Sequence, residues 1–270
     1  MMRTAVAVFT VLLAAPALLA VQWPEGQAAG VPRNADGSPN LGAPAPRAPN
    51  GKPDLSGVWR PERNQQCPPD GCPDNQMSEH FLDLGWGMKD GLPYQPWAAA
   101  LVKSRSARNG ADDPTSHCFP GGIVRLHTYP TYSKILQTPG LIVVLSERET
   151  TYRQIFLDGR PLPVDALPTW KGYSTGRWDG NTLIVQSSGF RGDGIWLDRK
   201  GSPLTDAAAI IERFRRVSYG RMEVEVTVND PKAYTRPFTV VLNEFLEPDM
   251  ELMDFVCLDI SRDAPDLIGK

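Results

Sequence analysis

The chain has 270 residues, including 26 prolines and 24 glycines, and its formal net charge at pH 7 is −3. Binding to nucleic acid depends on dense clusters of Lys and Arg facing phosphates, and the one short basic run, at 213–216, is better explained as a strand face, so we expect no nucleic-acid partner. The length fits one large domain or two small ones.

The N-terminal segment 1–20 has the pattern of a secretory signal peptide. One positive charge, Arg3, precedes an apolar run rich in Ala, Val and Leu. A membrane anchor is the alternative, but the run is shorter than the ~20 apolar residues of a spanning helix, and it contains Pro16. We therefore expect a periplasmic or secreted protein with no stable membrane anchor after cleavage of the signal.

The chain after the signal divides into an arm and a domain. Residues 21–53 are dominated by Pro, Gly, Ala and Asn, which predicts a linker or a loosely attached arm. Residues 54–270 are predicted to form a single domain. Its first run, DLSGVWR, predicts a short strand whose Trp59 fills one end of the core.

Four cysteines predict two disulfides in an exported chain. Three pairings are possible, and the short CPPDGC spacing favours Cys67–Cys72, which leaves Cys118 to pair with Cys257. Neither pair has the spacing of a redox or thiolate metal motif, and the three histidines show no ligand spacing. We predict no metal and no cofactor.

Residues 95–110 predict a short surface helix that begins near Pro96 and ends at Gly110. From Ile123 onward, a period of two indicates strands. The first is expected over 123–129, and the others over the runs LIVVLS, TTYRQIFL, TLIVQSSGF, IIERFRRV, RMEVEVTV, FTVVLNEFL and ELMDFVCLD.

This pattern predicts a mainly β fold of about eight or nine strands. A sheet of that size must close or double over to protect its edges. An antiparallel up-and-down β-barrel with a short surface helix is the simplest solution. A two-sheet sandwich is the alternative.

Two resemblances bear on this fold. The opening DLSGVW before a β-meander resembles the Gly-x-Trp start of lipocalin-like, or calycin, barrels. The chain from Asp54 to Cys257 is also similar to an uncharacterised family of exported bacterial proteins, through the motifs PDLSGVW, QPWAAAL, DDPTSHC, QTPG, RQIFLDGRP, GRWDGNTLIV, ERFRR and DPKAYTRPFTV. The resemblance implies a signal followed by a lipocalin-like barrel, and it implies no activity. The family pattern has His where this chain has Tyr173 and Leu204, so chemistry that depends on those histidines would be absent or relocated.

A small closed barrel can hold one ligand among its inward side chains. Extended backbone over 123–129 would place Arg125, His127 and Tyr129 on one face. His127 is then a candidate general base, with Tyr129 or Tyr173 as acid or oxyanion donor. Arg125 or Arg153 would bind an anionic group. The alternative is that this face of the strand is exposed to solvent.

Aromatic residues suggest a ligand-binding loop. Trp170, Tyr173 and Trp178 would cluster there, either to cover a pocket for an aromatic ligand or to cap the core. Tyr152 and Arg153 are neighbours on one strand, so only one of them can point into the barrel.

Carboxylates also occur in apolar strands, at Glu212, Glu244 and Asp254. Two of them could perform acid–base chemistry, as in glycoside hydrolysis. A structural ion pair, such as Glu212 with Arg236, is the alternative use.

These features predict an exported, cofactor-independent enzyme of the lyase, isomerase or hydratase type, which transfers protons on a small apolar, aromatic molecule. A carrier or scavenger of small hydrophobic molecules is the first alternative, and a glycan-binding or glycan-active protein is the second. The sequence contains no G-x-S-x-G, G-x-G-x-x-G or Walker motif.

Overall fold

The computed structural model describes residues 28–69, 71 and 76–257. The predicted signal segment 1–20 lies outside these residues, and so does Cys72, so the Cys67–Cys72 pairing stays a prediction. Within the described residues, no helix combines the length and apolar character needed to cross a membrane.

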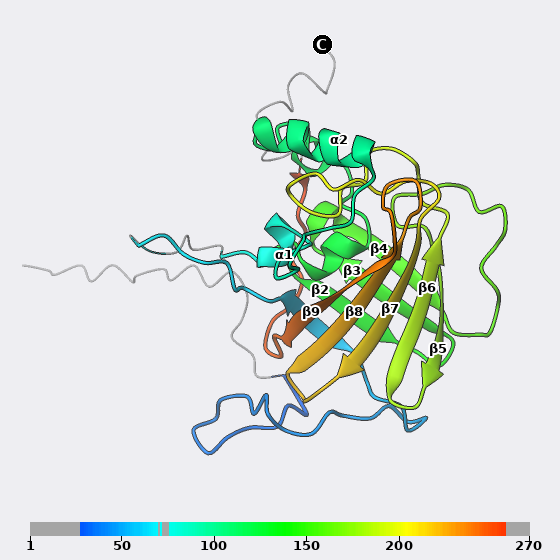
Figure 1. Cartoon of the computed structure of the whole chain (residues 1–270). Helices are drawn as coiled ribbons and strands as arrows, with labels where there is room; N and C mark the ends of the chain where they lie inside the picture. The colour runs from blue at the N-terminus through cyan, green and yellow to red at the C-terminus, as the bar shows by residue number, and fades with distance from the viewer. Residues whose placement is uncertain (1–27, 70, 72–75, 258–270) are drawn as a thin grey trace, which may run out of the picture.

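The strands of the described chain close into a barrel, as Figure 1 shows. Each strand pairs with the next, and the last pairs with the first. The nine strands found in the described residues are β1 (Gly57–Pro61), β2 (Ser133–Gln137), β3 (Leu141–Ser146), β4 (Thr151–Phe156), β5 (Tyr173–Asp179), β6 (Thr182–Ser188), β7 (Ala209–Arg216), β8 (Arg221–Asn229) and β9 (Phe238–Leu246). The prediction of a mainly β, closed barrel is confirmed, and the sandwich alternative is excluded.

Alternating side chains build the barrel core. In β8, residues Met222, Val224, Val226 and Val228 are buried and face inward, while the glutamates between them are only partly buried. The same alternation in β3, β6, β7 and β9 supplies the aliphatic interior. The period of two in the sequence therefore reports one buried and one solvated face per strand.

One joint departs from the predicted antiparallel order. β4 and β5 run parallel, and they pair only through Ile155 with Ser174 and Phe156 with Thr175. The connection 157–172 is long enough to carry the chain back along β4, so β5 starts in the same direction as β4. A tight hairpin would have forced the antiparallel arrangement.

Helices gather at one end of the barrel, and α2 lies across that end in Figure 1. Those named within the described residues are α1 (Glu79–Leu82), α2 (Pro96–Ala107) and three 3₁₀ helices, η1 (Pro114–His117), η2 (Val124–His127) and η3 (Arg148–Thr150). The helix predicted to start near Pro96 is confirmed, with the proline in its first turn.

The strand predicted over 123–129 is wrong, because this segment forms η2. Hydrogen bonds from Leu126 N to Ile123 O and from Thr128 N to Arg125 O close its turns. Both apolar and polar residues of η2 are buried, since the helix plugs the end of the barrel. The alternation of polar and apolar residues over 123–129 therefore does not mark a solvent-exposed face.

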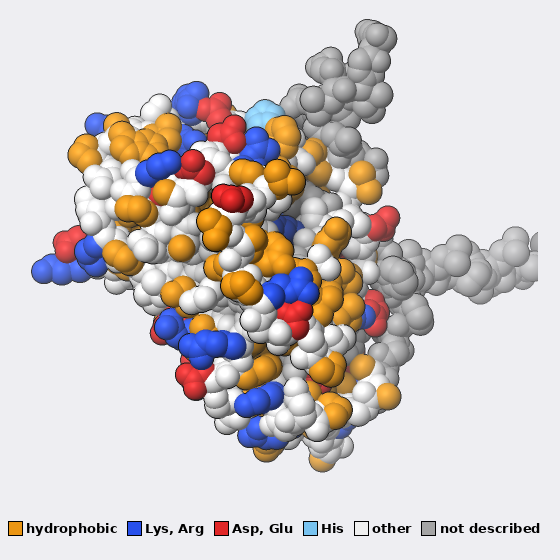
Figure 2. Space-filling model, turned by 90° about the vertical axis from the view of Figure 1, so that its right-hand side faces the viewer, with side chains coloured by type: hydrophobic (Ala, Val, Ile, Leu, Met, Phe, Trp, Pro, Cys, Tyr) orange, Lys and Arg blue, Asp and Glu red, His pale blue; other side chains and the backbone are white. Residues whose placement is uncertain are grey.

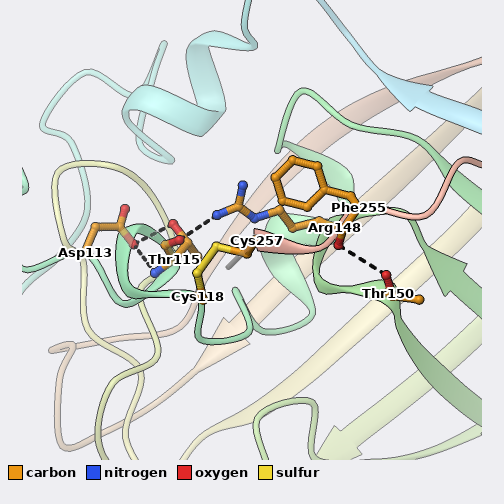
Figure 3. Close-up of a disulfide and its surroundings, with 7 residues drawn as sticks. All are labelled: Asp113, Thr115, Cys118, Arg148, Thr150, Phe255 and Cys257. Atoms are coloured by element: carbon orange, nitrogen blue, oxygen red, sulfur yellow. Dashed lines mark hydrogen bonds between the residues drawn. A yellow bond between two sulfur atoms is a disulfide. The ribbon is translucent and has the colours of Figure 1, made fainter. Parts of the chain in front are cut away.

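The strand predicted from ELMDFVCLD is also wrong over its described part, because residues 251–256 are irregular. β1 already pairs with β9, so closure of the barrel leaves no edge there for another strand. The segment is instead tied down by the disulfide Cys118–Cys257, which confirms the predicted long-range pairing. Figure 3 shows Phe255 and Arg148 beside this disulfide.

The arm that precedes β1 lies below the opposite end of the barrel in Figure 1. It contains two similar turns, PRNADGSPNL at 32–41 and PRAPNGKPDL at 46–55. In each turn the arginine forms a β-bridge with the proline six positions later and donates a hydrogen bond to the carbonyl of the glycine. The second turn leads into β1 and places Leu55 in the core.

Candidate functional site

A cluster of charged side chains lies inside the barrel. The Nε2 atom of His127 lies 2.8 Å from Glu212 Oε1, and its Nδ1 atom lies 2.6 Å from Glu244 Oε1. Arg153 donates from Nη1 to Glu212 Oε1 at 2.9 Å, and a second bond from Nη2 makes the pair bidentate. All four residues are buried.

Strand alternation explains why these side chains point inward. β4 buries Arg153 and Ile155 and leaves Tyr152 65% exposed. This agrees with the expectation that only one member of the Tyr152–Arg153 pair is interior. Glu212 and Glu244 occupy inward positions of β7 and β9, between buried apolar residues.

The cluster shifts two pKa values in opposite directions. Burial alone would lower the pKa of His127, but the charges and hydrogen bonds of Glu244 and Glu212 outweigh burial and raise it to about 9. Burial alone would raise the pKa of Glu212, but Arg153 and His127 lower it to about 2. At neutral pH the imidazole is therefore charged, and both of its nitrogens donate to carboxylates.

This arrangement bears on two of the expected roles. A charged imidazole has no lone pair with which to accept a proton, so His127 is not poised as a base at neutral pH. Because His127 also lies between Glu212 and Glu244, the space between the two carboxylates holds an imidazole rather than a sugar. Formally, two cations face two carboxylates, and the hydroxyls of Ser174 and Ser187 accept further hydrogen bonds from Arg153, at 3.2 and 3.0 Å.

A groove of about 450 Å³ lies in the barrel wall between the start of β4 and the chain that enters β5. Four aromatic side chains line it, and the polar part of the lining includes Arg153, Gln154 and Ser174. The aromatic members are Tyr152, Phe156, Trp170 and Tyr173. Figure 2 views the molecule from the β5–β6 side of Figure 1 and shows hydrophobic side chains gathered across the middle of this face.

Gly172 explains why the groove exists. Its φ of +63° lies in the left-handed region that favours glycine, and a Cβ there would lie 2.6 Å from the Ser188 carbonyl oxygen. The chain before it turns away from β4 toward the end of β6. There Thr169 N donates to Gly189 O, and Thr169 O accepts from Arg191 N. β4 and β5 consequently separate, and a gap opens in the wall.

The aromatic walls of the groove are held by further contacts. Phe156 and Tyr173 stack with their ring centroids 5.2 Å apart, and the Arg160 guanidinium lies 4.0 Å from the Phe156 ring centroid. Arg160 also donates to Tyr173 Oη at 3.1 Å. Trp170 stacks on Phe119 with a centroid distance of 5.6 Å. These contacts restrict the rings, so the groove is largely formed before a ligand arrives.

The structure separates the three residues that were expected on one strand face. His127 enters the barrel interior, whereas Arg125 forms a buried ion pair with Asp113 at 2.8 Å. Tyr129 packs edge-on against Phe81 at 4.9 Å. The 3₁₀ geometry of η2 sends neighbouring polar side chains in different directions, so they form no common strip.

Two more candidates lie away from the groove. Trp178 is on the distal half of β5, where it packs against the core. Asp254 is exposed on the irregular segment 251–256 and does not meet the buried carboxylates. In the part of the chain that the structure describes, no three His, Cys, Asp or Glu side chains are grouped to hold a metal ion.

Three residues that were not predicted from the sequence complete the buried charged cluster and the groove. Ser174 and Ser187 support Arg153, and Phe156 forms part of the groove. A signal was available for the first two, because each serine stands at an inward position of a strand. The position of Phe156 beside Tyr173 carried no such signal, since it depends on the parallel pairing of β4 and β5.

Comparison of the chain with protein-family models, with curated proteins and with solved structures finds no match. The function is therefore argued from the two sites alone.

Proposed function

We propose that this protein is an exported binding protein that carries or scavenges a small aromatic molecule in the groove between β4 and β5. The observation that carries the proposal is the lining of that groove, in which Tyr152, Phe156, Trp170 and Tyr173 surround a space of about 450 Å³. Apolar pockets of this size with a few polar groups are typical of small-molecule sites.

The disulfide Cys118–Cys257 supports the export part of the proposal. Disulfides persist in oxidising compartments such as the periplasm and the extracellular space. We propose that the N-terminal signal segment directs the chain there, and that the barrel is lipocalin-like, as the motifs of the exported bacterial family suggest.

Binding of a panel of indoles, naphthols and phenols, followed by isothermal titration calorimetry, tests the proposal. Trp170→Ala should weaken binding at least tenfold, which corresponds to about 1.4 kcal/mol, because it removes one aromatic wall. Trp86→Ala is the matched control, because Trp86 is exposed and does not line the groove. Equal affinity in the wild type and Trp170→Ala would contradict the proposed site.

Proton-transfer catalysis on the same ligand is a second candidate, favoured by Arg153. This residue both lines the groove and contacts Glu212 of the buried cluster, and strongly shifted pKa values are common at active sites. The hydroxyl of Tyr173 would act as the proton donor from the groove wall. Mass spectrometry of ligands after incubation separates the two candidates: an enzyme changes its ligand, and Tyr173→Phe then loses turnover while keeping affinity.

A further inference from the structure

We infer that the groove binds an extended peptide carrying an aromatic side chain, whose main chain adds to the free edge of β4. The inference rests on the proposed binding function and names the class of ligand. Its basis is the main chain of β4, which is distinct from the aromatic lining.

β4 is paired unequally on its two sides. Along its whole length, from Thr151 to Phe156, it pairs with β3. On the other side it pairs with β5 only at Ile155 and Phe156. The stretch 151–153 is thus a strand edge that faces the groove, and exposed edges are templates for pairing with another chain.

The direction of the main-chain groups follows from one hydrogen bond. Leu157 N donates to Gly140 O at 2.9 Å, so Leu157 faces the β3 side. Main-chain groups alternate sides along a strand, so Arg153 also faces β3, and Tyr152 faces the groove with both its N–H and its C=O. Among the residues that the structure describes, no side-chain or loop hydrogen bond reaches the main chain of Tyr152.

The opposite wall of the groove does not compete for these groups. Thr169 already exchanges both of its main-chain hydrogen bonds with the chain after β6, through Gly189 and Arg191. From this wall, Trp170 and Tyr173 line the groove with their aromatic side chains. A ligand strand would hydrogen-bond on its β4 side and make aromatic contacts on the other.

The strand geometry also sets the side-chain pattern of the ligand. The edge 151–153 spans roughly 10 Å at about 3.3 Å per residue, which suits about three residues. Ligand side chains on the outer face would meet Tyr152, Phe156 and Tyr173, and those on the inner face would meet Arg153 and Ser174. An aromatic residue alternating with a small polar one fits both faces.

Calorimetry with an acetylated, amidated tetrapeptide of alternating Phe and Ser tests the inference. Replacing each peptide N–H in turn by N-methyl should weaken binding at least tenfold at one position only, because the Tyr152 carbonyl oxygen is the groove-facing acceptor of the edge 151–153. Tyr152→Pro removes the groove-facing N–H and should weaken the peptide at least tenfold relative to Tyr152→Ala, which retains it.

The two proposals fail separately. The inference is overturned if N-methylation has no effect at any position, or if simple indoles and naphthols bind while the peptide does not. Loss of binding to both classes of compound would overturn the proposed function itself. If circular dichroism shows that Tyr152→Pro does not fold, the N-methyl series on the wild type still decides.

Discussion

The ring of His127 and the carboxylate of Glu212 are 85 positions apart in the chain and meet at 2.8 Å inside the barrel. This contact joins η2, which plugs one end of the barrel, to the middle of the wall in β7. Glu244 holds the other ring nitrogen from β9. The plug is therefore held by charge-assisted hydrogen bonds as well as by the apolar contacts of Ile123 and Val124.

Removing the imidazole should destabilise the fold strongly. His127→Ala leaves Glu212 and Glu244 with fewer partners in a buried site, and breaking a buried ion pair in this way costs about 3–5 kcal/mol. Urea denaturation measures the change. His117→Ala is the control, since His117 is exposed, and it should change the free energy of unfolding little. A small effect of His127→Ala would mean that water enters the cluster readily.

Stability should fall at alkaline pH because of the same residue. The pKa of His127 is about 9 in the folded protein, above its ordinary value of 6.5. Since the folded value is the higher one, the stabilisation is complete below pH 6.5 and is lost as pH rises toward 9, an effect on the order of 3 kcal/mol. Urea titrations across this range measure it. In His127→Gln this part of the pH dependence should disappear, and an unchanged profile would assign it to other groups.

At acidic pH the protein should lose stability because Glu212 becomes protonated. Its pKa is lowered from 4.5 to about 2, so its stabilisation is present above pH 4.5 and is lost as pH falls toward 2. Denaturation midpoints measured between pH 5 and 2 test this. Glu212→Gln should be less stable than the wild type at neutral pH and should lack part of the acid-induced change. A wild-type midpoint that stays constant over this range would contradict the assignment.

Gly172→Ala should both destabilise the protein and disturb the groove. The residue has a positive φ, and the new Cβ would meet the Ser188 carbonyl oxygen at 2.6 Å. Gly159→Ala is a matched control, because its φ is +83° but its Cβ position is open. The control measures the cost of the backbone conformation alone, about 1 kcal/mol. Thermal unfolding should therefore show a clearly larger loss for Gly172→Ala, and equal losses would indicate that the chain shifts to relieve the contact.

The two turns of the arm provide a matched pair of leucines. Leu55 is 1% exposed and belongs to the barrel core, whereas Leu41, at the equivalent position of the first turn, is 39% exposed. Leu55→Ala should cost about 2–5 kcal/mol by leaving a cavity. Leu41→Ala should cost much less, although its carbonyl accepts a hydrogen bond from Gly220 N. Urea denaturation of both variants checks this, and similar losses would show that the first turn is as tightly integrated as the second.

Local pattern was sufficient for much of the wall of the barrel. The alternation in RMEVEVTV predicts β8, and the adjacency of Tyr152 and Arg153 predicts that only one of them points into the barrel. The structure decided that it is Arg153. The pairing of Cys118 with Cys257 also followed from the sequence, once the short CPPDGC spacing was assigned to the other pair. In each case the prediction depends on a few neighbouring residues or on the number and spacing of the cysteines.

The alternation pattern gave wrong predictions where a segment that is not a strand has the sequence of one. Alternating polarity over 123–129 suggested a strand, but Arg125 and His127 are both buried, in different directions, on a 3₁₀ helix. The run at 251–256 has a strand-like composition, but barrel closure left no edge for it to pair with. Neither outcome is visible without the neighbouring strands.

The sequence by itself therefore determined seven of the nine described strands, all but β2 and β5, together with their alternation and a polar residue at several inward positions. These features depend on a period of two along one segment. Only the tertiary structure decided that Arg153, Glu212, His127 and Glu244 meet, and that β4 and β5 part to form a groove. The physical reason is that closure and strand register are long-range properties. They set which distant side chains share the interior and which edge stays unpaired, and no local pattern encodes them.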